Sequence, residues 1–368
     1  MLTGTRDTDR LLIITTFILV AVGVVMIYST SSIMAVKRFG SEYFFVKKHV
    51  VYFAVGLAAL LAAIKIPYRF YFKAAYPVLA ISAIALICIY IPGLGVKVGG
   101  AKRWVRLGPL TFQPSEPARL AVVMFLAYSL ASKGGRIRQF STGLLPNLVM
   151  PGIIAGLILL EPDFGTAATI AALVFILTFL AGARFFKHLL PLAVSGGVIG
   201  YAVVHHFSYM MNRIAVFLDP WKDPAGAGFQ IVQSLIAFGS GGIYGVGLGQ
   251  GKQKLFYLPE AHTDFILSVI GEEFGFIGVG GVMALYAAFL YCGVSIALKA
   301  KDMHAKYLAF GLTLMITLQA VINMAVVLGL VPTKGLTLPF ISYGGTSLVV
   351  NMVAVGILLN IWTTENRA

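Results

Sequence analysis

Apolar residues along the chain gather into long runs separated by short polar stretches. Ten runs approach the length needed to cross a hydrocarbon core of about 30 Å, which takes about 20 apolar residues in a helix. They fall near residues 11–33, 46–64, 74–91, 117–132, 144–160, 164–181, 188–206, 265–290, 307–330 and 339–362. The pattern predicts an all-α polytopic membrane protein with ten transmembrane helices, forming one membrane domain over residues 1–368.

A long loop lies between the seventh and eighth predicted helices, at residues 207–263. Within it, the segment Phe229–Gly239 is apolar with helical spacing but too short to span, so we expect an interfacial or re-entrant helix. The glycines that follow, between Gly241 and Gly251, do not fit a nucleotide-binding loop such as GxGxxG. We interpret them as a turn in which the backbone packs closely on a membrane helix.

The distribution of charge predicts which side of the membrane each connection faces. The short connections 65–73, 133–143, 182–187 and 299–306 are almost purely basic, which favours a cytoplasmic location for them and for both termini. Ten of the fourteen acidic residues then lie on the outer side, and the loop 207–263 is extracytoplasmic. Mixed, concentrated charge on one side predicts a polar site that faces the external medium.

Composition supports membrane insertion and excludes several other classes of protein. The chain is 59% hydrophobic and 11% charged, with a mean hydropathy of +0.90, which is outside the range of soluble domains. The net charge of +14 fits contact with anionic membrane lipids, and basic residues are not collected on a soluble face as in a nucleic-acid-binding protein. Both cysteines lie in apolar runs, without disulfide or metal-site spacing.

The eighth run is entered through an unusually polar stretch, FYLPEAHTDFILSVIGEEFGFIG, at residues 256–278. Carboxylates are costly in hydrocarbon, so each one needs a partner, a wet cavity or a chemical role. Asp264 has two interpretations: it caps the helix, or it faces a wet outer cavity as a general base. The neighbouring candidates for capping, orienting or ligand roles are Glu260, His262 and Thr263, although one histidine is weak evidence for a metal.

Three further polar clusters lie on the predicted outer side, at residues 99–120, 159–167 and 332–347. They contribute the cations Lys102, Arg103, Arg106, Arg119 and Lys334, and the acids and hydroxyls Glu116, Glu161, Asp163, Ser342 and Ser347. An arginine within a span is expensive unless paired, so Arg119 either has an acidic partner or extends to the interface. Cations suited to phosphate beside carboxylates suited to proton transfer indicate a reaction on a polyprenyl-phosphate-linked substrate.

Several motifs in order along the chain resemble the SEDS (shape, elongation, division and sporulation) family, the RodA/FtsW/SpoVE group. They are GAKRWVRLGPLTFQPSE, LEPDFGTA, NRI at 212–214, QSLIAFGSGGIYGVGLGQGKQK, YLPEAHTDFI, IGEEFGFIG and PTKGLTLPFISYGGTS. The resemblance implies ten transmembrane helices and peptidoglycan glycosyltransfer, the polymerisation of lipid II at the outer face of the bacterial cytoplasmic membrane. It also implies that Asp264 is the catalytic aspartate. Some relatives carry Glu where this chain has Phe256.

The resemblance further implies how the substrate and a partner would be bound. The pyrophosphate leaving group needs positive charge, for which the candidates are Lys102, Arg103, Arg106, Arg119, Arg213 and Lys334. A divalent cation, Mg²⁺ or Mn²⁺, is an open alternative, and the sequence requires no cofactor. The implied partner is a class B penicillin-binding protein, a transpeptidase. Short terminal tails favour an elongation-type, RodA-like member that serves rod shape.

Two other functions stay open at this point. A lipid II flippase would also place charged groups inside a membrane bundle, although here the acids are predicted on one side. A scaffold that only activates the transpeptidase would not need Asp264 for its function.

Overall fold

A computed structural model describes residues 7–98, 101–107, 110–206, 208–254, 258–259 and 261–365. The first seven helices are α1 (Asp7–Phe39), α2 (Phe44–Lys65), α3 (Tyr68–Cys88), α4 (Ser115–Lys133), α5 (Leu145–Leu160), α6 (Phe164–Leu180) and α7 (Leu190–His206). They are followed by α8 (Ser208–Leu218), α9 (Phe229–Gly241), α10 (Ile266–Lys299), α11 (Met303–Val327) and α12 (Gly345–Glu365). Three short strands lie between α3 and α4: β1 (Gly95–Val98), β2 (Ala101–Leu107) and β3 (Leu110–Phe112).

Each of the ten predicted spans coincides with a helix, but length separates them into two groups. Among the described residues, eight helical segments are long and apolar enough to cross a membrane. The other two windows correspond to α6 and α7, which have 17 residues each. At 1.5 Å per residue such a helix is about 26 Å long, which is less than the hydrocarbon thickness of about 30 Å. The structure therefore establishes a polytopic helical protein, and the count of ten stays a prediction.

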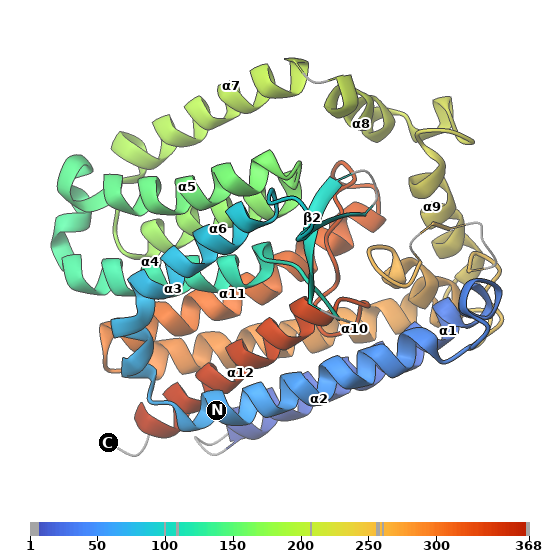
Figure 1. The fold of residues 1–368 in the computed structure, drawn as a ribbon, viewed down its shortest axis with the longest axis horizontal. Helices are drawn as coiled ribbons and strands as arrows, with labels where there is room; N and C mark the ends of the chain where they lie inside the picture. The colour runs from blue at the N-terminus through green and yellow to red at the C-terminus, as the bar shows by residue number, and fades with distance from the viewer. Residues whose placement is uncertain are drawn as a thin grey trace.

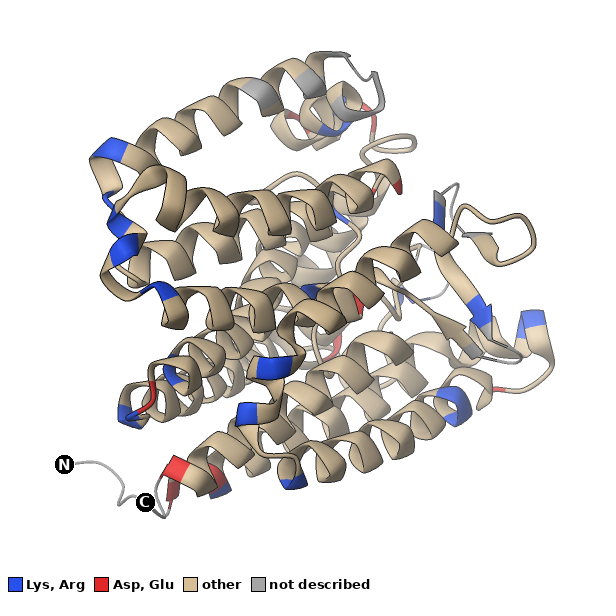
Figure 2. Cartoon of the chain, turned by 60° about the vertical axis from the view of Figure 1, so that its left-hand side comes forward, with Lys and Arg blue, Asp and Glu red and all other residues tan. Residues whose placement is uncertain are grey.

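The long helices run side by side between two ends of the molecule (Figure 1). The described chain ends, Asp7 and Glu365, lie at one end, which we call the terminus end. The strands, α8 and α9 lie towards the opposite end, which we call the loop end. Lys and Arg gather at helix ends and connections (Figure 2). This arrangement separates the basic short connections of the terminus end from the polar segments of the loop end.

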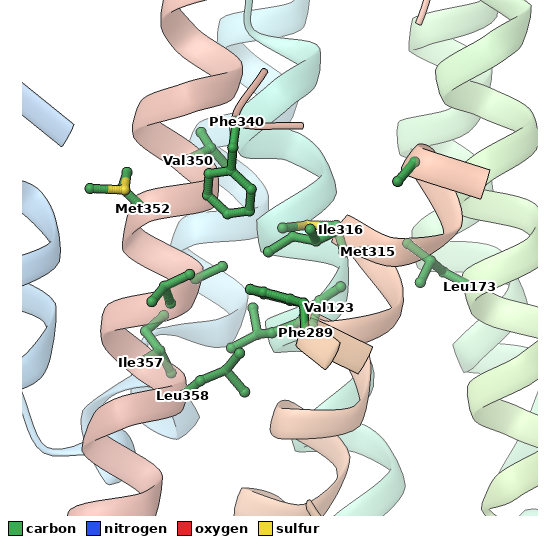
Figure 3. Close-up of a cluster of buried hydrophobic side chains, with 14 of the residues drawn as sticks. Val123, Leu173, Phe289, Met315, Ile316, Phe340, Val350, Met352, Ile357 and Leu358 are labelled. Carbon is green, nitrogen blue, oxygen red and sulfur yellow. The ribbon is translucent and has the colours of Figure 1, made fainter. Parts of the chain in front are cut away.

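The centre of the bundle is formed by α12 with α4, α10 and α11. In α12, 89% of the most apolar window is buried inside the protein, compared with 22% in α2. Side chains from these helices interdigitate around Phe289 and Phe340, with Val123, Ile316 and Val350 among their neighbours (Figure 3). In contrast, α2 and α3 expose many apolar side chains, as expected of helices that face hydrocarbon.

The segment between α3 and α4 is an antiparallel sheet in the order β1-β2-β3, so the all-α expectation is wrong here. Val105 of β2 pairs with Gly95 of β1 and with Phe112 of β3. The Tyr52 hydroxyl of α2 donates to the Thr111 carbonyl at 3.0 Å and so anchors the sheet to the bundle. Polar and apolar residues do not alternate strictly along AKRWVRL, so local periodicity does not predict this strand, and pairing with β1 and β3 holds it.

The glycine-rich segment after α9 packs against a break in α10. Gly275 has φ +64°, and its neighbourhood loses the regular helical hydrogen bonds. The loop replaces them: the amides of Val246 and Gly247 donate to the carbonyls of Glu272 and Glu273 at 2.9 and 3.0 Å. This arrangement satisfies backbone groups that would be costly in a membrane if left unpaired.

The two glutamates of α10 hold the same loop through their side chains. The Glu272 carboxylate accepts from the amide of Lys252 at 2.7 Å. Glu273 forms a buried ion pair with Lys254 at 2.7 Å and accepts from the Ser29 hydroxyl at 2.8 Å. Both acids therefore have structural partners in a loop that is close in sequence, which explains why they are tolerated in an apolar helix.

We expect Gly245→Ala to lower the melting temperature of the purified protein in detergent. Gly245 has φ +80°, and a Cβ there would lie 2.2 Å from the Glu273 carbonyl oxygen, so the loop would have to move. Left-handed backbone in a non-glycine residue alone costs about 1–3 kcal/mol. The matched control is Gly239→Ala, where a Cβ meets nothing within 4 Å and helix propensity improves. Equal melting temperatures for the two variants would contradict this assignment.

Candidate active site

A polar cavity of about 200 Å³ opens at the loop end of the bundle. It brings together five of the predicted site residues from five separate segments of the chain: Arg103, Asp163, Arg213, Asp264 and Lys334. Gln230, Thr333 and the turn before α6 complete its wall. Because three cations and two acids converge on one open cavity, it is the candidate active site.

Asp264 lies in a turn that is fixed by hydrogen bonds to its backbone. Asn323 of α11 donates to the Asp264 carbonyl at 2.8 Å. The Ser342 hydroxyl donates to the Thr263 carbonyl, and the amide of Tyr343 donates to the His262 carbonyl at 2.9 Å. The N-cap of α10 is Phe265, so Asp264 does not occupy the cap position. Its half-buried side chain therefore lines the cavity from a rigid support. Its carboxylate lies so close to Gly335 that a Cβ added there would be 3.2 Å from Oδ2.

The cations in the cavity are attached to the loops that form its wall. Arg103 of β2 donates to the carbonyls of Glu161, at 3.0 Å, and Pro162. Arg213 of α8 donates to the carbonyl of Thr333, next to Lys334. Desolvation lowers the pKa of the half-buried Lys334 ammonium. These bonds hold both guanidinium groups at the wall of the cavity, where they can contribute positive charge toward an anionic ligand.

A buried polar network supports the cavity from inside the bundle. Arg119 is 1% exposed and forms an ion pair with Glu116, one turn earlier on α4. Arg119 also donates to the Gln319 side chain of α11, whose amide nitrogen donates to the Thr337 carbonyl at 2.8 Å. The expectation that Arg119 needs an acidic partner is confirmed. The network ties α4 and α11 to the segment that carries Lys334.

The tight turn between α5 and α6 contains two acids in different states. Asp163 caps α6 by accepting from the Thr166 amide at 3.1 Å and from the Thr166 hydroxyl at 2.8 Å. Glu161 is 1% exposed, and both of its carboxylate oxygens have no hydrogen-bond partner among the described residues. Burial and the nearby Asp163 raise the pKa of Glu161 to about 8, against the opposing effect of Arg103. Glu161 is therefore an acid that holds its proton near neutral pH.

We expect the stability of the wild type to depend on pH through Glu161. Its pKa is about 8 when folded and about 4.3 in an unfolded chain, so the folded state holds the proton more tightly. The stabilisation is fully present below about pH 4.3 and is lost as pH rises through 8. The wild-type melting temperature in detergent should fall between pH 6 and 9 by at least about 2–4 °C more than that of Glu161→Gln. Parallel pH profiles would contradict this ionisation.

Other predicted site residues lie outside the cavity. Lys102 and Arg106 are exposed on β2. The His262 ring packs 4.6 Å from the Phe45 ring, and Ser342 and Thr263 hold the turn that carries Asp264. Ser347 is buried in the first turn of α12. Glu260 and Phe256 lie outside the described residues.

Several residues at the site were not predicted from sequence. Gln319 and Asn323 lie four residues apart on α11, so they share one face of an otherwise apolar helix. That pair of amides was a detectable signal. Gln230 and Thr333, in contrast, line the cavity from segments that the sequence analysis singled out without indicating these two side chains.

Within the described residues there is no group of three or more His, Cys, Asp or Glu side chains that could hold a metal ion. Asp163 and Asp264 both line the cavity, although the Asp163 carboxylate already accepts two hydrogen bonds. A divalent ion with few protein ligands, such as Mg²⁺, would take one or both of these carboxylates and complete its shell with substrate phosphate and water.

Comparisons with known proteins agree along nearly the whole chain. The family model FTSW_RODA_SPOVE, described as "Cell cycle protein", matches residues 9–367. A protein of Trichlorobacter lovleyi named "Probable peptidoglycan glycosyltransferase FtsW" is 48% identical, with 96% of this chain and 92% of that protein covered. A chain from a solved peptidoglycan synthase complex has a TM-score of 0.79 at 30% identity, covering 97% of this chain and 98% of that chain.

The crystal structure of the Thermus thermophilus rod shape determining protein RodA is also similar. Its TM-score is 0.70 at 28% identity, with 96% of both chains covered. Sequence motifs, fold and family model thus agree, and the chain belongs to the FtsW/RodA/SpoVE family, the SEDS family that its motifs indicate.

Proposed function

We propose that the chain is a peptidoglycan glycosyltransferase that polymerises lipid II into β-1,4 glycan strands at the outer face of the cytoplasmic membrane. The enzyme class is that of its relatives at up to 48% identity. The observation that carries the proposal is the cavity in which Asp264 lies with Arg103, Arg213 and Lys334. A carboxylate beside several cations suits the transfer of a sugar from a pyrophosphate.

In the proposed reaction the Asp264 carboxylate accepts the proton of the acceptor sugar's 4-hydroxyl. The hydroxyl oxygen attacks the anomeric carbon of the donor from the side opposite the leaving group, which inverts that carbon. The bond from the anomeric carbon to the pyrophosphate oxygen breaks, and undecaprenyl pyrophosphate leaves with the electron pair. The three cavity cations stabilise the charge that develops on this leaving group.

The exposed and buried cations have different parts in this proposal. Lys102 and Arg106 are exposed on β2 and would attract the lipid-linked pyrophosphate before it enters the cavity. Arg119 is fully buried and paired, so it positions the wall of the cavity and does not contact substrate. A divalent ion, when bound at Asp163 or Asp264, would supply additional positive charge to the pyrophosphate.

The cellular role that we propose is cell division with a class B penicillin-binding protein as partner. The short tails predicted an elongation-type protein, but the comparisons do not support it, since the relative at 48% identity is named FtsW and the RodA structure is 28% identical. The solved complex at 30% identity concerns polymerization and crosslinking, which supports a crosslinking partner. Both termini are proposed to be cytoplasmic, with α8 and α9 on the outer side.

The test is polymerisation of fluorescent lipid II by the purified chain together with a class B penicillin-binding protein whose transpeptidase serine has been replaced. We expect glycan strands that are resolved on a gel and digested by a muramidase. A preparation that forms no strands but moves lipid II between the leaflets of proteoliposomes would contradict the proposal and indicate a flippase. A preparation that shows neither activity but stimulates an intact transpeptidase would indicate a scaffold.

A further inference from the structure

A second cavity, of about 430 Å³, lies at the terminus end, where α3, α4 and the start of α11 meet. Its polar wall consists of Arg69 and Lys73 of α3, Ser132 of α4, and Asp302 with His304 at the start of α11. The candidate active site is at the opposite end of the same helices. The glycosyl transfer proposed above therefore gives this cavity no role.

The two cations of this cavity are not part of the protein's buried ion pairs. Arg69 and Lys73 are four residues apart on α3 and so lie on the same face of the helix, both exposed. The buried ion pairs Arg119–Glu116 and Lys254–Glu273 involve neither of them. Two exposed cations on one wall of a cavity form a binding site for an anion with more than one oxygen.

The acid of the cavity is already bonded to the protein. One oxygen of Asp302 accepts from the His304 amide at 3.0 Å and caps α11, and the other accepts from the Tyr68 hydroxyl at 3.0 Å. The side chains that line the cavity therefore carry two positive charges and one negative charge, and the negative one is bonded to the start of α11 and to Tyr68 of α3. A second carboxylate, Glu365, lies behind Tyr68 and accepts from its hydroxyl at 2.7 Å. The 25-residue helix α11 adds the positive end of its dipole at the same place.

His304 adds a buried donor or acceptor to this wall. It is 3% exposed, and its Nε2 has no partner among the described residues. The ring is held between aromatic side chains, with centroids 4.8 Å from Phe72 and 6.3 Å from Tyr68. A buried imidazole nitrogen without a partner is costly, so it favours a ligand or ordered water in the neighbouring space.

The apolar surroundings indicate a lipid and not a free anion. Phe72, Ala131 and Met303 line the cavity together with the cations, and Met303 is 47% exposed. Further along α3, away from the cations, Ile81 and Ile84 are 64% and 60% exposed. A phosphate held at Arg69 and Lys73 would thus have an apolar helix face beside it, where acyl chains can lie.

We propose that this cavity binds the headgroup of an anionic phospholipid, with Arg69 and Lys73 on the phosphate and the acyl chains along the outer face of α3. The site does not depend on the proposed glycosyltransferase activity. Its ligand is one lipid molecule in a fixed position, which distinguishes it from general attraction between a basic protein surface and the membrane.

The test is native mass spectrometry of the full chain in detergent with phosphatidylglycerol, phosphatidylcholine or inorganic phosphate added. We expect one phosphatidylglycerol to bind wild type, and Arg69→Gln with Lys73→Gln to weaken that binding about tenfold or more. The matched control is Arg184→Gln with Lys187→Gln, which removes two exposed charges at the connection between α6 and α7 and should keep the lipid.

Three results would overturn the proposal. The first is equal loss of phosphatidylglycerol in both double variants, which would indicate general charge attraction. The second is equal binding of phosphatidylcholine, and the third is displacement of the lipid by inorganic phosphate at millimolar concentration, which would indicate a site for a free anion. Melting curves of both double variants establish that each is folded, and the exposure of all four side chains makes this the expected result.

Discussion

Replacing Asp264 by Asn is expected to lower the rate of glycan strand formation by about 10²–10⁴-fold, the usual contribution of a general base. Asn has nearly the same shape as Asp but does not accept a proton at neutral pH. The turn that carries residue 264 is held through backbone carbonyls by Asn323, Ser342 and Tyr343, so the substitution leaves its position unchanged. The measurement is the initial rate of polymerisation of labelled lipid II.

The control for this variant is Asp7→Asn, the same chemical change at the exposed start of α1 and at the other end of the bundle. It should polymerise lipid II at the wild-type rate. Comparable rates for Asp264→Asn and Asp7→Asn would exclude Asp264 as the base. The search would then move to Asp163, the second carboxylate of the cavity.

Removing one partner of the buried pair between Arg119 and Glu116 is expected to destabilise the fold by about 3–5 kcal/mol. Arg119 is 1% exposed, and its guanidinium also donates to Gln319. In Arg119→Met the Glu116 carboxylate is left buried without its cation, and α4 loses its polar link to α11. The melting temperature in detergent and the yield of monodisperse protein should both fall sharply.

Two comparisons make this prediction specific. The control Arg106→Met removes an exposed arginine from β2 and should leave the melting temperature unchanged. The double variant Glu116→Gln with Arg119→Met removes both charges and should be more stable than Arg119→Met alone, because no buried charge is left unpaired. A single variant as stable as wild type would mean that water or lipid solvates Glu116, in contradiction to the buried network.

The long apolar runs allowed the helices to be predicted because a membrane span requires about 20 consecutive apolar residues. Helix ends were less predictable. The last span was placed from residue 339, but α12 begins at Gly345. Residues before it form a turn in which the Ser342 hydroxyl accepts from the Leu338 amide at 2.8 Å and donates to Thr263. Those bonds depend on a distant segment, so no local pattern reveals them.

The candidate site was predictable in its chemistry and only partly in its composition. The cost of charge near hydrocarbon singled out Asp264, and the polar clusters of the predicted outer side contributed Arg103 and Lys334; the structure places all three around one cavity. The same reasoning drew attention to Glu272 and Glu273, which instead hold the glycine-rich loop. The cost of burial identifies a charge that needs a partner, but it does not distinguish a structural partner from a substrate.

Contacts between distant segments account for what the sequence did not reveal. The bond from Arg119 to Gln319 joins residues that are 200 positions apart. The cavity likewise takes Gln230 from α9 and Arg213 from α8, which approach Asp264 only when the loop folds back on the bundle. The strand β2 likewise depends on pairing with β1 and β3, since AKRWVRL has no strict alternation of polar and apolar residues.

The most direct test of the central claim measures lipid II binding and lipid II polymerisation in the same samples of wild type, Asp264→Asn and Asp264→Ala. Each sample is the purified complex with a class B penicillin-binding protein, matched for folding and complex yield. The account predicts that both variants retain lipid II and the partner but form glycan strands at least about 100-fold more slowly than wild type. Strands formed by both variants at the wild-type rate would contradict it, because Asp264 would then have no part in the chemistry.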